Sequence, residues 1–286
     1  MSYRRRSSPL HAAHAGAGCA YCLALALGAL MFDNPVALGA VVVALLGAGI
    51  GAKVWRELRR AALLALPLAV VIVLVNALVT RDGLTVIVRL GDLPVLGHTD
   101  VTLEATAYGG ILALRAAALI LAGALYTVAV DPDEVLRMFR RVSFRSALTA
   151  TLATRMVPLL VRDSRRLADA QRCRPGPPPS RLRLIRAASS GVLDRALDVA
   201  AALEVRGYGS TRRPPRTRRP HGRHELEFGL SAGLILGLAV VARSADLVPF
   251  RAYPALQAPA SASVAMVALA IVVLTLLPFA DRRGIE

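Results

Sequence analysis

Four residues near the start of the sequence have the types and spacing of metal ligands. His11 and His14 lie three positions apart, as do Cys19 and Cys22, and this spacing places two side chains on one face of a helix. Both cysteines, however, fall inside an apolar run, the histidines lie near its start, and no carboxylate supports them. We therefore expect no metal site here. Three cysteines in the whole chain also indicate no disulfide framework.

A nucleotide-binding loop is missing from the sequence. Such a loop needs Gly-Lys followed by Ser or Thr, so that backbone N–H groups and the lysine hold the phosphates. The only lysine of the chain, Lys53, follows Ala52 and does not fit this pattern. We therefore expect that the chain does not hydrolyse ATP by itself.

Two predicted helices end alike, with small residues before an arginine and a helix breaker after it. The two endings are Cys173-Arg174-Pro175 and Val205-Arg206-Gly207, with the arginines 32 positions apart. A cation at a helix C-terminus is stabilised by the helix dipole, by about 0.3–1 kcal/mol, and this would account for either arginine alone. It accounts less well for two helices with the same ending. A slim helix tip with an arginine also suits insertion into a groove and pairing with a carboxylate there.

The elements around these helix ends are predicted membrane spans. The chain has 286 residues and is 55% hydrophobic but only 5% aromatic, a composition typical of membrane helices. Its formal net charge of +16 would suggest nucleic acid in a soluble protein. Most of the basic residues, however, lie in four segments that alternating topology places on one side: residues 4–6, 53–60, 137–223 and 282–283. This is the positive-inside pattern, and it explains the charge without nucleic acid.

Six apolar runs define the expected spans: Gly16–Phe32, Val36–Ala52, Ala61–Thr80, Leu103–Val130, Leu226–Ala242 and Ala262–Ala280. The first run could also be a secretory signal, because arginines precede a short apolar run rich in small residues. The span that follows at once and the charges of the loops favour a retained helix. We predict an all-α polytopic membrane protein with both termini on the cytoplasmic side.

Three regions follow from this pattern. Residues 1–130 form a membrane part with about four spans, and residues 226–286 form a second membrane part with two spans. Residues 131–225 form a basic cytoplasmic domain that begins with Asp131 as an N-cap. In it we expect two long amphipathic helices, over residues 147–174 and 181–206, each with an apolar face laid against another apolar surface.

Several residues inside the spans have expected structural roles. Small residues four apart allow helices to approach closely, and two rows have this spacing: Gly47 with Gly51, and Gly229 with Gly233 and Gly237. The second row could also touch another membrane protein. The polar residues of the spans are Asn76, Glu104 and Arg115. A charge in the bilayer is costly and faces a protein interior, so Arg115 is expected to pair with Glu104, to bond Asn76, or to act in transport.

Nearly the whole chain resembles the transmembrane T component (EcfT/CbiQ family) of energy-coupling factor (ECF) transporters for vitamins and metals. Residues 202–209, Ala-Leu-Glu-Val-Arg-Gly-Tyr-Gly, resemble the second arginine signature of that family, and residues 170–174 resemble the first. The likeness continues, in the family's order, through Asn34-Pro35, Asn76, residues 102–104, Tyr108-Gly109, Arg115, residues 131–133 and residues 155–158. The first signature has Cys173 and Pro175 where Ala and Gly are usual.

The resemblance implies a non-catalytic subunit of an ATP-driven importer, with no cofactor of its own. In that family each arginine signature ends a coupling helix and seats in a groove of one of two ABC ATPases, which bind ATP and Mg²⁺. A separate small membrane S component binds the vitamin or metal ion. The implied location is the cell membrane.

Two other classes of protein fit the sequence less well. A polytopic membrane enzyme would gather carboxylates, histidines or a Ser/His/Asp set at one membrane face, and the sequence has no such pattern. A membrane-anchored nucleic-acid binder would interleave aromatic residues with its basic ones, but residues 131–225 contain only Phe139, Phe144 and Tyr208. We therefore expect no nucleic-acid partner.

Overall fold

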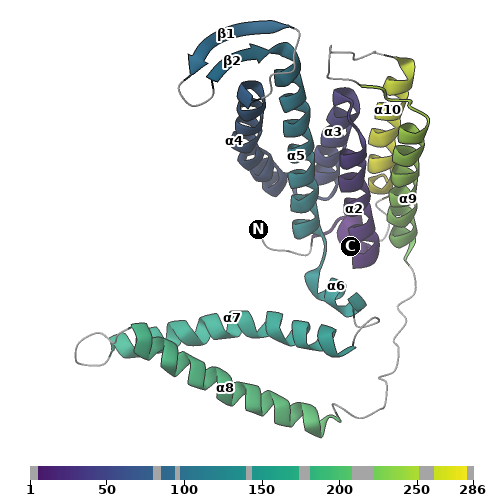
Figure 1. Ribbon diagram of the computed structural model, residues 1–286. Coiled ribbons are helices and arrows are strands. Elements are labelled where there is room, and N and C mark those ends of the chain that lie inside the picture. Colours follow the sequence, from purple (N-terminus) through teal and green to yellow (C-terminus); the bar gives the residue numbers. More distant parts are fainter. Residues whose placement is uncertain are drawn as a thin grey trace. The chain divides into compact units, whose positions relative to one another are not determined.

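The computed structural model describes residues 6–79, 85–93, 97–139, 144–173, 181–207, 222–250 and 261–281. Within these ranges the chain is helical except for one two-stranded hairpin. It divides into two compact units (Figure 1). The first, here called the membrane unit, contains residues 1–135 and 221–286, and the second, the two-helix unit, contains residues 136–220.

The membrane unit is built from apolar helices. They are α2 (Ala15–Met31), α3 (Pro35–Gly51), α4 (Trp55–Val79), α5 (Leu103–Ala129), α9 (Arg223–Ser244) and α10 (Ala262–Leu276). Four of these helices are long and apolar enough to cross a membrane: α4, α5, α9, and α10 extended by the 3-10 turn η1 (Leu277–Phe279). The other two, α2 and α3, are shorter apolar helices. The predicted fold class, an all-α polytopic membrane protein, is confirmed.

Short polar caps set where these helices begin. The side chain of Asn34 accepts a hydrogen bond of 2.9 Å from the N–H of Val36, and Pro35 takes the first helical position of α3. Thr102 caps α5 in the same way, through the N–H of Ala105. The start of α4 differs from the prediction. Helix begins at Trp55, so the expected basic turn over residues 53–60 is limited to its first two residues, where Lys53 has a φ of 58°.

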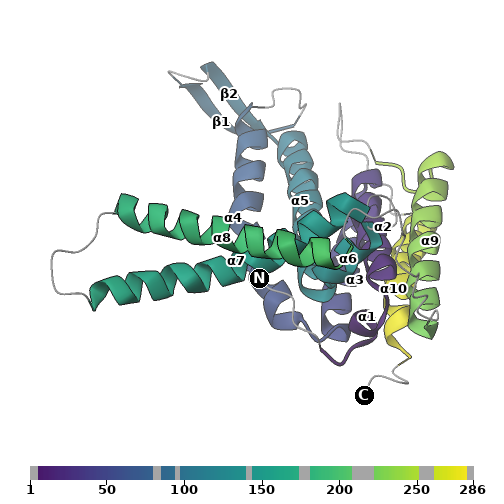
Figure 2. The same cartoon turned by 90° about the horizontal axis from the view of Figure 1, so that it is seen from below.

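Three helix pairs account for most of the packing in the membrane unit. The closest pairs are α4 with α5, α2 with α9, and α3 with α10 (Figure 1 and Figure 2). Between α2, α9 and η1, the rings of Tyr21, Phe228 and Phe279 meet edge to face, with centroids 5.2 Å apart for the two pairs that include Phe228. The Tyr21 hydroxyl donates a 2.8 Å hydrogen bond to the carbonyl of Thr275, which satisfies the polar end of a fully buried side chain.

The loop between α4 and α5 contains the hairpin. Strand β1 (Val86–Leu93) pairs antiparallel with β2 (Gly97–Thr102), and the register shifts twice along β1. Figure 1 shows the hairpin at the shared end of α4 and α5. The sequence predicted turns and an apolar patch in this loop, but it did not predict strands, because the segment lacks regular alternation of polar and apolar residues.

The short helix α6 (Pro132–Phe139) leads from the membrane unit into the two-helix unit. Asp131 accepts a 2.9 Å hydrogen bond from the N–H of Asp133, so the predicted N-cap is confirmed. The two-helix unit itself consists of α7 (Phe144–Arg172) and α8 (Arg181–Val205), which lie side by side and antiparallel in both views. An ion pair between Asp163 of α7 and Arg195 of α8 joins them.

Candidate functional site

The second arginine signature lies at the C-terminal end of α8, and its backbone has the geometry of a helix stop. The N–H of Arg206 bonds the carbonyl of Ala202 at 3.2 Å, and the N–H of Gly207 turns back to the carbonyl of Glu204 at 2.8 Å. Gly207 has a φ of 76°, in the left-handed region where a residue with a Cβ is strained. A glycine after the arginine is therefore what allows α8 to end with its last carbonyls satisfied.

The tip of α8 is open to its surroundings. Val205 is 90% exposed, and Arg206 and Gly207 are exposed as well. Among the described residues, the side chain of Arg206 has no hydrogen-bond or ion-pair partner. An apolar side chain and a guanidinium at a thin helix end can enter a groove, and a carboxylate there could receive two parallel N–H bonds from the arginine.

The first arginine signature follows α7 and is described only in part. Cys173 continues the helical hydrogen bonding, with its N–H 3.2 Å from the carbonyl of Asp169, and its side chain is exposed. Arg172 pairs with Asp169 at 3.5 Å. Arg174 and Pro175 lie outside the described residues, so the expected stop after Arg174 stays a prediction.

The antiparallel pairing separates the two signatures. The end of α7 lies beside the start of α8, so Cys173 and Val205 are at opposite ends of the two-helix unit (Figure 1). The 25 residues of α8 correspond to about 37 Å at 1.5 Å per residue. The two signatures cannot enter one groove, and each needs a docking place of its own.

The apolar residues of α8 are only partly covered. Val199 and Leu203 are half-buried, as the predicted stripe requires, whereas Leu182 and Ile185 at the other end of the stripe are each 68% exposed. On α7, Val157 is 59% exposed. Pairing of the two helices therefore leaves apolar surface uncovered within the two-helix unit.

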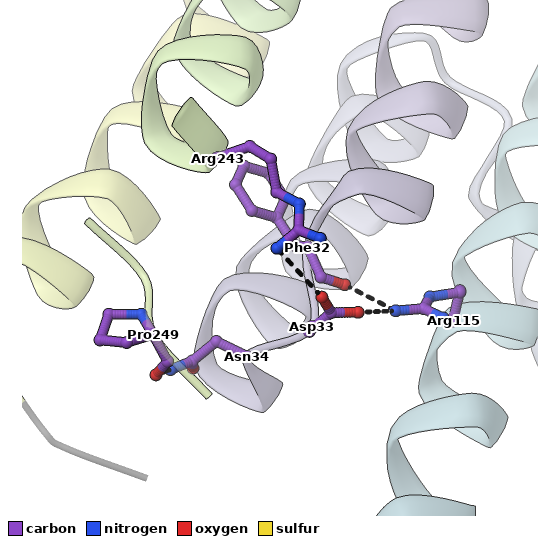
Figure 3. Close-up of polar contacts among 6 residues, drawn as sticks. All are labelled: Phe32, Asp33, Asn34, Arg115, Arg243 and Pro249. Atoms are coloured by element: carbon purple, nitrogen blue, oxygen red, sulfur yellow. Dashed lines mark hydrogen bonds and ion pairs between the residues drawn. The ribbon is translucent and has the colours of Figure 1, made fainter. Parts of the chain in front are cut away.

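Within the membrane unit, Arg115 of α5 lies at a polar node between helices (Figure 3). Its Nη2 donates to the Asp33 carboxylate at 2.7 Å and to the carbonyl of Phe32 at 3.0 Å. Arg243 of α9 lies 3.6 Å from the other Asp33 oxygen. Asn34, next in the chain, donates to the carbonyl of Pro249 at 3.4 Å. One turn between α2 and α3 thereby holds α5, α9 and the segment after α9.

This node corrects the expected pairing of Arg115. Its partners are Asp33 and Phe32, and neither Asn76 nor Glu104 is among them. The Asn76 amide donates to the carbonyl of Ile72 in its own helix. Glu104 is buried and accepts from the N–H of Thr85 at 3.2 Å. Both residues lie too far along α4 and α5 toward the hairpin to meet Arg115, which is three turns further into α5.

The two glycine rows behave differently. A Cβ on Gly47 would lie 2.9 Å from the Leu276 side chain, and one on Gly51 would lie 2.6 Å from the Phe279 ring. Close packing of α3 against α10 and η1 depends on both. The row on α9 does not pack in this way: Gly229, Gly233 and Gly237 are exposed and have nothing within 4 Å of an added Cβ. The expected tight contact of that row is wrong for the part of the chain described.

The two histidines near the N-terminus have partners within the protein. His11 bonds Ser8 at 2.7 Å, and His14 accepts from the N–H of Gly16 and lies 3.5 Å from the Glu134 carboxylate. No group of three His, Cys, Asp or Glu residues suited to a metal ion is found among the residues described. His14 and Glu134 instead join the start of α2 to the start of α6.

Sequence reasoning missed Asp33, Arg243 and the role of Glu134. Asp33 and Arg243 stand at the ends of apolar runs, where a charge is ordinarily assigned to the membrane surface. Glu134 stands three residues after the Asp131 cap, the position of the acidic residue of a capping box, but its carboxylate accepts from the N–H of Ala15 at 3.2 Å. The usable signal was charge balance: an arginine inside a span needs a carboxylate partner, and Asp33 is the acidic residue of the turn between the first two spans.

Comparison with known proteins places the chain in a family. No curated protein matched the sequence. Residues 6–217 match the profile of the CbiQ family, described as cobalt transport protein. The matched range covers most of the membrane unit and the whole of α7 and α8 with both arginine signatures. The chain is therefore a membrane protein that belongs to the CbiQ family of cobalt transport proteins.

Proposed function

We propose that this chain is the transmembrane coupling subunit of an ECF-type ABC importer. It would transmit the movement of two ABC ATPases to a small membrane S component that binds a vitamin or a metal ion. Membership of a transport family supports the general assignment. The observation that carries the coupling role is the exposed tip of α8. There Val205 and Arg206 are exposed at the end of a helix that Gly207 terminates.

Each ATPase would receive one arginine signature. Because the signatures lie at opposite ends of the two-helix unit, one pair of helices can bridge two ATPases, or the two halves of a fused ATPase. In each groove the arginine would pair with a carboxylate, and the apolar neighbour, Val205 in α8, would fill the space beside it. ATP and Mg²⁺ would be bound and used by the ATPases alone.

Transmission then follows from the geometry of the helices. Closure of the ATPases on ATP would move the two grooves toward each other, and the tips of α7 and α8 would move with them. The helices would shift relative to each other as stiff levers, with the ion pair between Asp163 and Arg195 holding them together. Their uncovered apolar residues, such as Leu182 and Ile185, would contact the S component. The chain would sit in the cell membrane with both termini in the cytoplasm.

The test is purification of the tagged full chain from its own membranes in mild detergent, followed by mass spectrometry of the proteins retained. Wild type is expected to retain ABC ATPases and a small membrane protein. Arg206→Glu, alone or with Arg174→Glu, should lose the ATPases and keep the small protein, and Arg206→Ala should lose less. Arg186→Glu is the matched control, since it reverses an exposed charge on the same helix.

Two results would count against the proposal. One is a wild-type chain that retains no ATPase in any of several detergents. The other is an Arg206→Glu chain that retains ATPases as well as the Arg186→Glu control does.

A further inference from the structure

Helix α4 is the least covered span of the membrane unit. Only 11% of its most apolar window is buried inside the protein, against 33–39% for α5, α9, and α10 with η1. The covered face carries Leu58, Ala61 and Ala65, which pack toward the rest of the unit. The opposite face is exposed. Because α4 crosses a bilayer, this face contacts lipid.

On the exposed face of α4, arginines at the start of the helix are followed by apolar residues. Starting from the first turn, its residues recur at alternating steps of three and four and so form one line along the helix. This basic–apolar stripe consists of Arg56, Arg59, Leu63, Leu66 and Val70. Both arginines are exposed, and the three apolar residues are 54–57% exposed. A third arginine, Arg60, is exposed beside the stripe.

The stripe has the dimensions of one lipid molecule in one leaflet. From Arg59 to Val70 the helix rises about 16 Å, and half of the hydrocarbon core is about 15 Å. A headgroup held by the arginines would place its acyl chains along Leu63, Leu66 and Val70. Trp55 is 42% exposed one turn before Arg59, and tryptophan is the residue that membrane proteins place at the headgroup level.

The protein balances only part of the charge of this site. Glu57 is the acidic residue of the segment, and its carboxylate pairs with Arg6 from the N-terminal segment. Arg6 also donates to the carbonyl of Lys53, so it bridges the turn before α4 and that carboxylate. Arg60 also interacts electrostatically with Glu57, but Arg56, Arg59 and Arg60 make no ion pair among the described residues, and their charge stays available to an outside anion.

We propose that the basic–apolar stripe of α4 binds an anionic phospholipid, with its phosphate at Arg56, Arg59 and Arg60 and its acyl chains on Leu63, Leu66 and Val70. Anionic lipid is favoured over a protein helix as the occupant because the stripe begins with three exposed arginines that make no ion pair among the described residues. The proposal requires only that α4 spans a bilayer, and it does not depend on the coupling function.

The first test measures lipid retention by native mass spectrometry of the purified full chain. The probes are phosphatidylglycerol and phosphatidylcholine with the same acyl chains. Wild type should retain phosphatidylglycerol, and Arg56→Gln/Arg59→Gln/Arg60→Gln should reduce its apparent affinity by about tenfold or more, to the level of phosphatidylcholine. The matched control is Arg162→Gln/Arg165→Gln/Arg166→Gln on α7, which removes three exposed arginines of identical spacing and should retain the lipid as wild type does.

The second test leaves the arginines intact. A photo-crosslinking residue at Leu66, activated in native membranes, should yield adducts of phospholipid mass enriched in the anionic class. Adducts with a polypeptide as the main product would overturn the proposal and assign the stripe to a protein partner. Retention of phosphatidylglycerol by the α4 triple variant, or equal loss by the α7 control, would overturn it as well.

Discussion

Leu25 of α2 and Leu193 of α8 both lie in the interior of a helix, yet Leu25 is fully buried and Leu193 is 64% exposed. In the membrane unit, α2 has neighbours on several sides, namely α5, α9 and α3. Among the described residues of the two-helix unit, α8 packs against one helix, α7. A helix with one neighbour can bury only one narrow face, so the rest of its apolar surface stays uncovered within the unit.

The exposed leucines of α4 do not have the same explanation as those of α8. Helix α4 is apolar along most of its length, and lipid is an adequate surrounding for its open face. Helix α8 mixes exposed leucines with exposed charges such as Arg186 and Asp194, which a bilayer interior would exclude. Similar exposure therefore has two different explanations: lipid for the membrane unit and, under the proposed function, protein partners for the two-helix unit.

The largest expected effect tests burial in the two units with the same truncation. Leu25→Ala should destabilise the membrane unit by about 2–4 kcal/mol, because it leaves a cavity between packed helices. Leu193→Ala should change stability by less than about 0.5 kcal/mol. Thermal and denaturant unfolding of the purified full chain in detergent would measure both. Equal losses for the two variants would break the comparison.

A middle-sized effect is expected for the two Arg–Asp ion pairs. Arg115 with Asp33 lies in the membrane unit and Arg195 with Asp163 joins α7 to α8. Because Arg115 is also held by the Phe32 carbonyl and so loses less side-chain entropy on pairing, double-mutant cycles with Arg→Gln and Asp→Asn should give couplings of about 1–2 kcal/mol for the first and below about 1 kcal/mol for the second. A larger coupling for Asp163–Arg195 would contradict this account of the node around Asp33.

The smallest expected effects concern two glycines of the α8 segment. Gly207→Ala should open the helix end, because Ala at a φ of 76° costs about 1 kcal/mol. Gly191→Ala, with nothing within 4 Å of the added Cβ, should stabilise the helix by about 0.5–1 kcal/mol. Hydrogen exchange of the full chain should show roughly fivefold faster exchange near Arg206 for the first and slower exchange around residue 191 for the second. A change of the exchange rate in the same direction for both variants would refute the role given to Gly207 in ending α8.

The sequence predicted the helices well because their signals are local. The Asp131 cap, the length of the apolar runs, and the glycine after Arg206 each act within a few residues. The small-residue pair Gly47 and Gly51 was also interpreted correctly, since close approach to another helix is what the pair permits.

Pairing between distant segments was harder to predict. Arg115 meets Asp33 across 82 positions, and nothing in the spacing of either residue specifies the other. The row Gly229, Gly233 and Gly237 has the same pattern as Gly47 and Gly51, but it faces outward. A row of small residues shows that another helix can approach that helix face closely. Whether a helix packs there depends on the arrangement of the helices in the fold.

The most direct test of the central claim is photo-crosslinking from position 205, the 90% exposed residue before Arg206. A photoreactive residue replacing Val205 in the tagged chain, activated in native membranes, is expected to form an adduct with an ABC ATPase. The adduct should be lost with Arg206→Glu, and the same photoreactive residue at Val157 of α7, which is 59% exposed, should not form it. An absence of any ATPase adduct at position 205, or the same adduct from both positions, would contradict the claim that the tip of α8 couples this protein to an ATPase.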